Sequence, residues 1–320
     1  MEISHEGVAN LDILADVLRA QRLRGTVYFR ADFREPWGLD IQGGEFANFH
    51  IVVRGRCWLR TGPTGSVRAL ETGDVVLFPH GSPHALLHAP DAVAFPASEV
   101  TVDDSVSDEV TENRVFGGTG TVTTTLICGH FELDRNASHP LLESLPSVVL
   151  VKASQHSRAE WLATAGHLAS AESSTNRPGV SAIVDKLAEA LLVQTLLGYV
   201  ESMSQFEEAN FLAAIQDRCI GRVLELIHQD PARDWTLNEF VREAGVSRSV
   251  LTERFRALVG ESPMVYLARW RMLKSRELLR DTSLTIAQVA YSVGYGSEFS
   301  FAKAFKRFFY IPPGQARGNA

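Results

Sequence analysis

The chain has 320 residues, 45% of them apolar, which is enough for two or three domains with ordinary hydrophobic cores. Its net charge of −7 is unevenly distributed, because residues 1–216 carry 15 Lys and Arg against 27 Asp and Glu, whereas residues 217–320 carry 16 against 11. We see no secretory or membrane segment, and three widely spaced cysteines argue against a disulfide framework. These features predict a cytoplasmic protein that is not bound to a membrane and whose C-terminal part is basic.

The first part of the chain reads as β structure after one short helix. Residues 10–23 place leucines on one helical stripe, and the apolar period then shifts toward two. Alternating or β-branched runs broken by Gly and Pro follow, which is the pattern of a sandwich or a small closed barrel. We therefore expect a first domain over residues 1–140.

From Pro140 onward the pattern becomes helical. Ile183, Leu187 and Leu191 belong to an apolar stripe on a helix over residues 181–199, and an acidic segment follows it. Such a helix could pack on its own barrel or against a second copy of the chain. We expect residues 141–210 to form a helical linker and possible dimerisation region.

The C-terminal residues 211–320 predict two helix-turn-helix units. In the second unit, apolar residues recur at helical spacing from Ile286, Gly294 ends that helix, and Ser297 caps the next one. About fifty residues upstream, Gly245 and Ser247 occupy the same positions in a matching unit. A helix with a basic face is expected to connect the two copies.

Two such units joined by SPMVYLARWRMLKSRELL resemble the DNA-binding domain of the AraC/XylS family of bacterial transcription regulators. The resemblance covers about Asp217–Arg317 and includes the closing GYGSEFSFAKAFKRF. Tyr310 stands where that family usually has Gly, and Ala316 where it usually has an aromatic residue, so the end of the last recognition helix departs from the pattern. The resemblance implies binding to double-stranded promoter DNA, homodimerisation, and activation of transcription through contact with RNA polymerase.

A double helix-turn-helix is expected to set its two recognition helices into successive major-groove segments, ~34 Å apart. The residues expected to face bases are Arg248, Ser249, Thr252 and Glu253 in the first unit, and Glu298, Ser300 and Lys303 in the second. The residues expected at phosphates are Arg254, Arg256, Lys306 and Arg307. Arg can hold guanine with two bonds and Glu can accept from cytosine, whereas Ser and Thr suit several bases. The alternative for each residue is a solvated helix surface.

Residues 73–84 read GDVVLFPHGSPH, which has the spacing of the second cupin motif, and FHIVVRGRCWL upstream resembles a degenerate first motif. This part therefore resembles the cupin-type sensory half found in one branch of the same family. The implied fold is an α+β multidomain chain, with an N-terminal cupin-like β-barrel followed by helices and a C-terminal all-α domain with two helix-turn-helix motifs. Of the residues that bind metal in the first motif of metal-binding cupins, only His50 remains.

His50 and His84 could still face each other inside the barrel and bind zinc or a similar divalent metal, with Cys128 as the third ligand, or His130 or His88 in its place. Alternatively, these histidines are structural and Cys128 is a buried apolar filler, since a redox role would need an exposed thiol of lowered pKa. The residues expected to line an effector pocket are Trp37, His50, Trp58 and His84.

Together these features predict a sequence-specific regulator whose cupin-like domain senses a small molecule, a metal or a redox signal and thereby controls DNA binding or activation. Two alternatives are a cupin enzyme fused to a DNA-binding domain, and a DNA-binding protein that works without a ligand. The sequence contains no Gly-rich phosphate loop, no G-x-S-x-G and no H-E-x-x-H, so we expect a protein that is not an enzyme.

Overall fold

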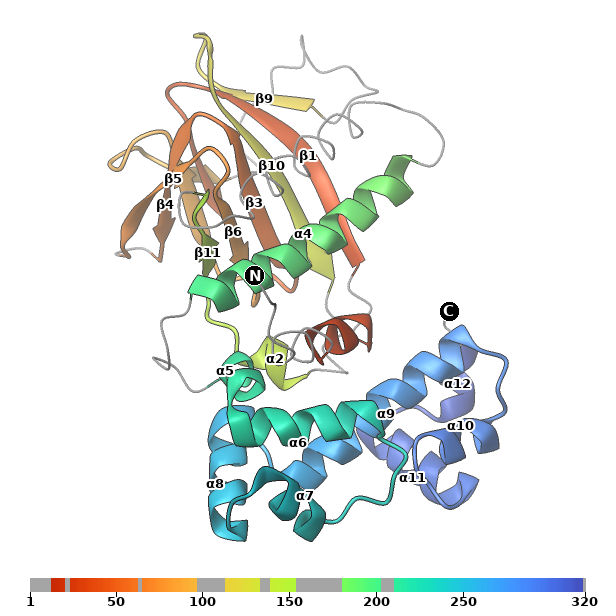
Figure 1. Cartoon of the computed structure of the whole chain (residues 1–320). Coiled ribbons are helices and arrows are strands. Elements are labelled where there is room, and N and C mark those ends of the chain that lie inside the picture. The colour runs from red at the N-terminus through yellow and green to blue at the C-terminus, as the bar shows by residue number, and fades with distance from the viewer. Residues whose placement is uncertain are drawn as a thin grey trace, which may run out of the picture. The chain divides into compact units, whose positions relative to one another are not determined.

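The computed structural model describes residues 13–20, 24–62, 65–96, 113–132, 139–153, 180–202 and 210–318 (Figure 1). The chain divides into two compact units. The β unit combines Leu23–Leu133 with Leu145–Ser204, and the helical unit combines Met1–Arg22, Asp134–Ser144 and Gln205–Ala320. Within the described ranges, no helix has both the length and the apolar character needed to span a membrane.

The β unit contains two sheets. The first has the order β11 (Val149–Val151), β6 (Val75–Phe78), β3 (Ala47–Arg54), β10 (Val122–Glu132), β1 (Arg24–Arg34) and β9 (Asn113–Gly117). The second has the order β5 (Val67–Glu71), β4 (Arg56–Thr61), β7 (His84–Leu87), β2 (Gly38–Ile41) and β8 (Phe95–Pro96). Most neighbouring strands are antiparallel, and the long β1 and β10 pair over almost their whole length.

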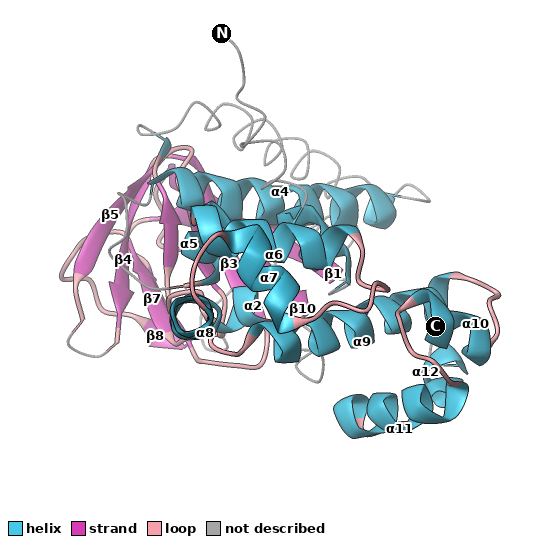
Figure 2. Cartoon of the chain, turned by 60° about the horizontal axis from the view of Figure 1, so that its bottom comes forward, coloured by secondary structure: helices cyan, strands magenta, loops and turns pink. Residues whose placement is uncertain are grey.

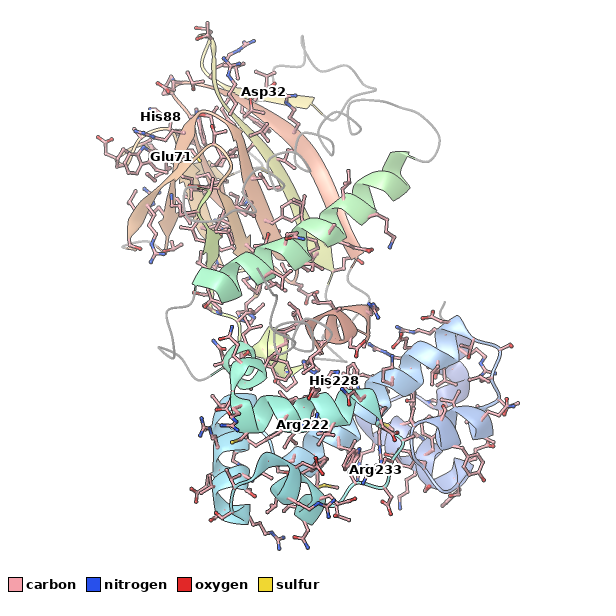
Figure 3. All side chains as sticks on the ribbon, in the orientation of Figure 1. Asp32, Glu71, His88, Arg222, His228 and Arg233 are labelled. Atoms are coloured by element: carbon pink, nitrogen blue, oxygen red, sulfur yellow. The ribbon has the colours of Figure 1, made fainter. Side chains whose placement is uncertain are left out.

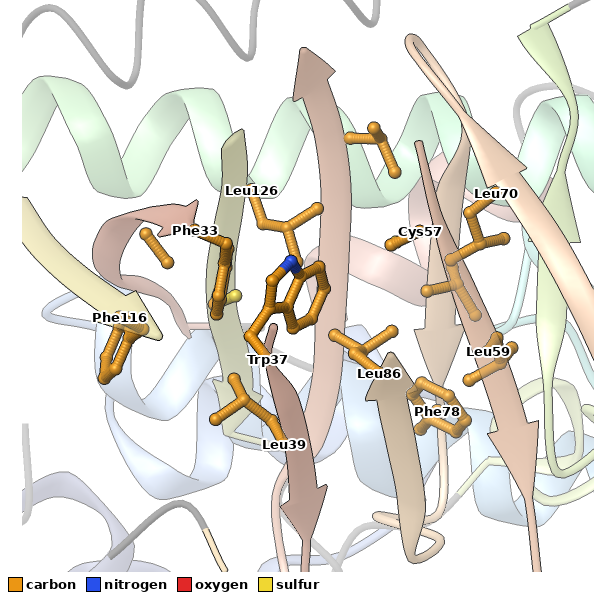
Figure 4. Packing of buried hydrophobic residues seen from close by; sticks show 14 residues of the cluster. Phe33, Trp37, Leu39, Cys57, Leu59, Leu70, Phe78, Leu86, Phe116 and Leu126 are labelled. Carbon is orange, nitrogen blue, oxygen red and sulfur yellow. The ribbon is translucent and has the colours of Figure 1, made fainter. Parts of the chain in front are cut away.

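One hydrophobic core lies between the two sheets (Figure 4). Inward-facing residues alternate along the strands, so Phe33 and Leu126 come from the first sheet, and Leu59 and Leu86 from the second. The predicted cupin-like architecture is confirmed. Among the described strands, however, hydrogen bonding forms two separate sheets and not one closed barrel.

The motif glycines explain how the strands turn. Gly81, in the GDVVLFPHGSPH segment, has a φ of 65°, and a Cβ atom there would lie 2.2 Å from the Gly44 carbonyl oxygen. Gly55 has a φ of 83°, and its Cβ would lie 2.0 Å from the Thr123 carbonyl oxygen. Both positions therefore require glycine, because a side chain would meet backbone atoms and a left-handed conformation at once.

Helix α4 (Val180–Ser202) packs against β1 and β11 of its own unit. Leu191, Thr195 and Leu196 are buried, and a Cβ at Gly198 would lie 3.0 Å from Val151. The C-terminal part of the apolar stripe is therefore buried within the chain's own β unit. This corrects the expected independent region over residues 141–210, since β11 and α4 both belong to the β unit.

The helical unit is built from nine labelled helices and a helical segment at residues 13–20 (Figure 2). They are α2 (Pro140–Glu143), α5 (Phe211–Gln216), α6 (Arg218–Gln229), α7 (Leu237–Ala244), α8 (Arg248–Val259), α9 (Pro263–Asp281), α10 (Ile286–Ser292), α11 (Glu298–Phe309) and α12 (Pro313–Gly318). Residues 13–20 were expected in the first domain, and α2, apart from Pro140, in the linker region, but both belong to this unit.

The two helix-turn-helix units, α7–α8 and α10–α11, have equivalent caps. Capping boxes at Thr236 and Thr285 start α7 and α10, and the side chains of Ser247 and Ser297 cap α8 and α11. Helix α9 connects the two units and contacts α8, α10 and α11. The expected repeat is thus present in the caps as well as in the apolar pattern.

Tyr310 ends α11 in a left-handed conformation, with a φ of 62°, and its N–H donates to the Lys306 carbonyl. Gly260 ends α8 in the same way, with a φ of 87°. The last recognition helix therefore forms its C-cap despite the missing glycine. For a residue with a Cβ this conformation costs ~1–2 kcal/mol.

We expect Tyr310→Gly to stabilise the helical unit by about 1 kcal/mol, because it removes left-handed strain while the 80% exposed ring loses little packing. Thermal unfolding of the full chain measures this. Gly260→Ala is the matched control and should destabilise by a similar amount, since no atom lies within 4 Å of the added Cβ. A destabilised Tyr310→Gly protein would contradict the strain argument.

Candidate nucleic-acid interface and sensory interior

Helix α8 exposes most of the side chains expected to face bases. Its buried face consists of Leu251, Phe255 and Val259, so Arg248, Ser249 and Glu253 are left in solvent. Thr252 differs, because it is half-buried and its hydroxyl donates to the Arg248 carbonyl at 2.8 Å within the same helix. This bond leaves Thr252 less able to donate to a base than was predicted.

Arg254 has a structural role that the sequence did not indicate. It forms an ion pair with Asp217, whose side chain is 2% exposed and caps the start of α6 by accepting from Cys219 and Ile220 at 2.9 Å each. The ion pair fastens α8 to α6. Of the cations expected at phosphates in this unit, Arg256 is exposed at the end of α8.

Helix α11 presents Glu298, Ser300, Lys303, Lys306 and Arg307 on its exposed side. Its other side is buried through Phe301, Phe305 and Phe309, as the sequence predicted. The Ser300 hydroxyl donates to the Ser297 carbonyl at 2.9 Å, so it helps to close the first turn. The three predicted base-facing residues of the second unit are therefore accessible on one helix.

The expected basic face of α9 is mostly used to hold the unit together. Arg269 binds Glu261 through two nitrogens, at 3.0 and 3.2 Å. Arg271 donates to the Pro231 and Arg233 carbonyls at 2.7 and 2.8 Å, beside the turn glycine of the second unit, where a Cβ on Gly294 would lie 2.8 Å from the guanidinium. These cations fix the spacing of the helices, which leaves the recognition helices as the better candidates for DNA contact.

In the β unit, the structure brings His50, His84 and Cys128 together between the sheets. His84 Nδ1 lies 2.9 Å from the Ser82 carbonyl, His84 Nε2 lies 2.8 Å from His50 Nε2, and His50 Nδ1 lies 3.1 Å from Cys128 Sγ. A carbonyl can only accept, so His84 Nδ1 must donate, and in a neutral ring its Nε2 then accepts. His50 Nε2 therefore donates to His84, and the Cys128 thiol donates to His50.

This interior histidine chain (Cys128, His50, His84 and the Ser82 carbonyl) is satisfied when every member is neutral. Burial lowers the pKa of His50 well below its usual value and, despite opposing contributions from the Ser82 carbonyl and Asp40, lowers that of His84 to about 4. Burial also raises the pKa of the Cys128 thiol. The interior histidine chain is thus a neutral, hydrogen-bonded part of the core. The pKa of the Cys128 thiol is raised, whereas a reactive cysteine needs a lowered pKa.

The three atoms predicted as metal ligands do not converge on one point. Cys128 faces one nitrogen of His50, and His84 faces the other nitrogen, on the far side of the ring. Across the described ranges, no group of three or more His, Cys, Asp or Glu is placed to hold a metal ion.

Of the residues expected in an effector pocket, Trp37 belongs to the same interior as His50 and His84. Its ring stacks on Phe33 at 4.1 Å, and Figure 4 shows the indole at the centre of the core. Trp58 does not join them. It alternates along β4 with the buried Cys57 and Leu59, so it lies on the opposite face of the sheet.

The helical unit contains a second buried polar chain, which sequence reasoning missed. His139 Nδ1 accepts from the Leu141 backbone, so its Nε2 donates to the Tyr266 hydroxyl at 3.1 Å. The Tyr266 hydroxyl donates in turn to His228 Nε2 at 2.8 Å, and His228 Nδ1 faces Asp16 at 3.6 Å. Figure 3 shows His228 on α6.

This Asp16–His228–Tyr266–His139 chain joins residues 13–20 and α2 to α6 and α9. Burial lowers the pKa of both histidines and raises that of Tyr266, so all three are neutral near pH 7. The one hint in the sequence was Tyr266 itself, within the segment PMVYL. The positions of His139 and Asp16 could not be derived, because both lie more than a hundred residues from their partners on α6 and α9 or from each other.

The comparisons with known proteins agree with both units. The family described as a cupin matches residues 12–201, and the family described as a helix-turn-helix domain matches residues 240–319. A putative AraC-like transcription regulator from Streptomyces lividans is 31% identical over 312 residues, covering 96% of this chain and 98% of that protein. The regulator MtrA from Neisseria gonorrhoeae is 31% identical over the same shares.

Among solved structures, the C-terminal domain of AraT from Geobacillus stearothermophilus is 30% identical, covers 32% of this chain and 87% of that one, and has a TM-score of 0.31. The cupin match covers the two-sheet unit, the helix-turn-helix match covers most of the paired motifs, and the two regulators align over nearly the whole chain. The chain therefore belongs to the AraC family of DNA-binding transcription regulators, with a cupin-type domain in its N-terminal part.

Proposed function

We propose that the cupin-type domain binds a small organic molecule between its sheets and that binding controls how the helix-turn-helix units engage promoter DNA. The observation that carries this proposal is the indole nitrogen of Trp37. Trp37 is 5% exposed, and its Nε1 has no hydrogen-bond acceptor within the described part of the chain. A buried donor without a partner costs ~1–3 kcal/mol.

The surroundings of Trp37 suggest which chemical class would complete the site. Phe33 and Phe116 stack near the indole, and Leu39 and Leu86 belong to the same core. An apolar body would fit these side chains, and one carbonyl or carboxylate oxygen would accept from the indole N–H. The neutral histidine chain contributes no charge, so the effector expected here is largely apolar with a single acceptor group.

One end of the antiparallel β1–β10 pair could carry the effect of ligand binding to the helical unit. Arg24 pairs with Glu132 where β1 begins and β10 ends. In sequence, three residues separate β1 from residues 13–20, and seven residues separate β10 from α2. Asp16 and His139, at these two points, contact His228 and Tyr266 of the helical unit. We infer that a ligand-dependent shift of β1 and β10 would act on α6 and α9 through these short links.

Metal and redox sensing are weaker alternatives. Zinc would need an ionised thiol and free ring nitrogens on one point, whereas the described geometry uses each nitrogen of His50 for a different partner. Zinc binding therefore stays a prediction, and elemental analysis of the purified protein would measure its zinc content. Cys57 and Cys128 are both buried with raised thiol pKa values, which disfavours fast oxidation.

Homodimerisation, contact with RNA polymerase and activation of transcription are also part of this proposal. On α4, Leu191, Leu192 and Leu196 are buried by the chain's own β unit, so these three residues are not free for a dimer contact. An enzymatic role is the lesser candidate, since the relatives that span nearly the whole chain are named as transcription regulators.

Trp37→Phe should separate effector binding from folding. The substitution keeps an aromatic ring but removes the donor that lacks an acceptor and part of the buried indole, so we expect the free protein to stay folded and to lose about 1–2 kcal/mol of stability to the cavity. A panel of small carboxylates and ketones with aromatic or aliphatic bodies is screened by thermal shift on the wild type. Compounds that stabilise the wild type should lose most of that effect on Trp37→Phe. Undiminished stabilisation of the variant would place the ligand elsewhere.

The interior histidine chain predicts acid sensitivity of the β unit. The pKa of His84 falls from 6.5 to about 4 on folding, so the unfolded chain takes up a proton that the folded chain does not as the pH drops through this window. The contribution of His84 to the free energy of unfolding is fully present above pH 6.5, and from His84 alone this free energy should fall by up to about 3 kcal/mol as the pH drops to 4. His50 acts in the same direction.

Hydrogen exchange of the β10 amides, corrected for intrinsic exchange rates, measures this loss of stability. His84→Asn should flatten the pH dependence. His80→Asn is the control for replacing a histidine, because His80 is exposed, donates to the Leu145 carbonyl at 2.8 Å and is not part of the interior histidine chain. An equally steep dependence in His84→Asn would show that the acid sensitivity arises elsewhere.

A further inference from the structure

Phe299, in the first turn of α11, is 81% exposed and is the most exposed large apolar side chain within the described ranges. Burying a phenylalanine side chain stabilises a protein or a complex by ~1.5–3 kcal/mol, and Phe299 does not contribute this stabilisation in the isolated chain. The neighbouring Phe301 is fully buried, so the helix has no shortage of apolar residues for its own core. We therefore expect the exposed ring to contact another molecule.

The position of Phe299 identifies the surface on which that partner would lie. Lys303 and Lys306 follow at spacings of four and seven residues, so they share one face of α11 with Phe299. The opposite face packs into the domain through Phe301, Phe305 and Phe309. The Ser297 side chain accepts from the Ser300 N–H at 3.2 Å, which fixes the first turn that carries Phe299.

We propose that Phe299 contacts the 5-methyl group of a thymine in the major groove and makes the second helix-turn-helix unit select for thymine at one position. Thymine is the base that presents a methyl group in this groove, and an apolar side chain such as Phe is suited to contact it. The cations beside the ring favour DNA over an apolar protein surface as the partner, because they would meet phosphates when the ring meets the base. The proposal rests on the DNA-binding role of the family.

The first unit provides an internal contrast. Counting from the capping serines Ser247 and Ser297, the residue equivalent to Phe299 is Ser249, which is exposed and carries a hydroxyl 3.2 Å from that of Ser247. A serine hydroxyl can donate to or accept from the edges of several bases, and it gains little from contact with a methyl group. The thymine preference is therefore confined to the half of the site that α11 reads.

The experiment removes the methyl group from the DNA and the ring from the protein. A high-affinity duplex is selected from a random pool with the full-length wild type, and each thymine is then replaced in turn by uracil, which differs only by the methyl group. We expect one replacement to weaken wild-type binding about 3- to 10-fold, as the loss of one buried methyl contact should. Phe299→Ser should weaken binding to the thymine duplex by a similar factor and be insensitive to the same replacement.

Tyr310→Ala is the matched control, because it removes an 80% exposed ring just beyond the other end of α11 and should keep the wild-type response to uracil. The proposal is overturned if no uracil replacement affects the wild type, or if every replacement affects wild type and Phe299→Ser equally. It is also overturned if Phe299→Ser binds the thymine duplex normally but loses transcriptional activity, since the ring would then contact a protein. Failure of the wild type to select any sequence would instead refute sequence-specific DNA binding itself.

Discussion

The hydroxyl of Tyr266 lies between two buried imidazoles, and the arrangement of the helical unit depends on this contact. His139 donates to the hydroxyl, the hydroxyl donates to His228, and His228 faces Asp16, so segments near residues 16, 139, 228 and 266 are joined by one directed chain. Buried polar groups favour one arrangement when their hydrogen bonds are satisfied. Here the Tyr266 hydroxyl is satisfied by both imidazoles, whereas His228 Nδ1 faces Asp16 at 3.6 Å, beyond hydrogen-bond distance. Because Trp270 stacks on His228 at 4.0 Å, the same chain also orients α9, which connects the two recognition units.

The β unit follows the same physical logic in its interior. Cys128, His50 and His84 form a second directed chain of neutral groups that ends on the Ser82 carbonyl. That arrangement satisfies the residues that were expected to bind metal, and it leaves the Trp37 indole as the unsatisfied donor among the four residues proposed for the effector site. The contrast between satisfied histidines and an unsatisfied tryptophan is why we place an acceptor-bearing effector, and not a metal ion, at the centre of the proposed function.

Local sequence patterns predicted the features that depend on neighbours along the chain. Gly245, Ser247 and Ser297 cap or end their helices where expected, because capping is decided within one turn. The patterns failed where contacts between residues far apart in the sequence decide the role of a side chain. Asp217 and Arg254 form an ion pair across 37 positions, so a cation that looked free for phosphate fastens two helices.

Other differences have equally specific causes. Trp58 was expected among the effector residues, but its place in the alternation of β4 directs it to the other face of the sheet. Phe299 was overlooked because an apolar residue within a helix is usually taken as core, whereas its 81% exposure is visible only once Phe301 and Phe305 define the buried side. The proximity of His50, His84 and Cys128 was anticipated, yet their tautomers, which decide between a metal and a hydrogen-bonded core, required the Ser82 carbonyl.

The paired helix-turn-helix units predict that α8 and α11 of one chain read two adjacent major-groove segments on the same DNA face. A hydroxyl-radical footprint of the full-length protein on its selected duplex tests this most directly. We expect two protected segments about one helical turn apart on one face, with Lys303→Ala weakening only one of them and Arg248→Ala only the other. A single protected segment, or equal weakening of both segments by either substitution, would contradict the two-helix reading of DNA.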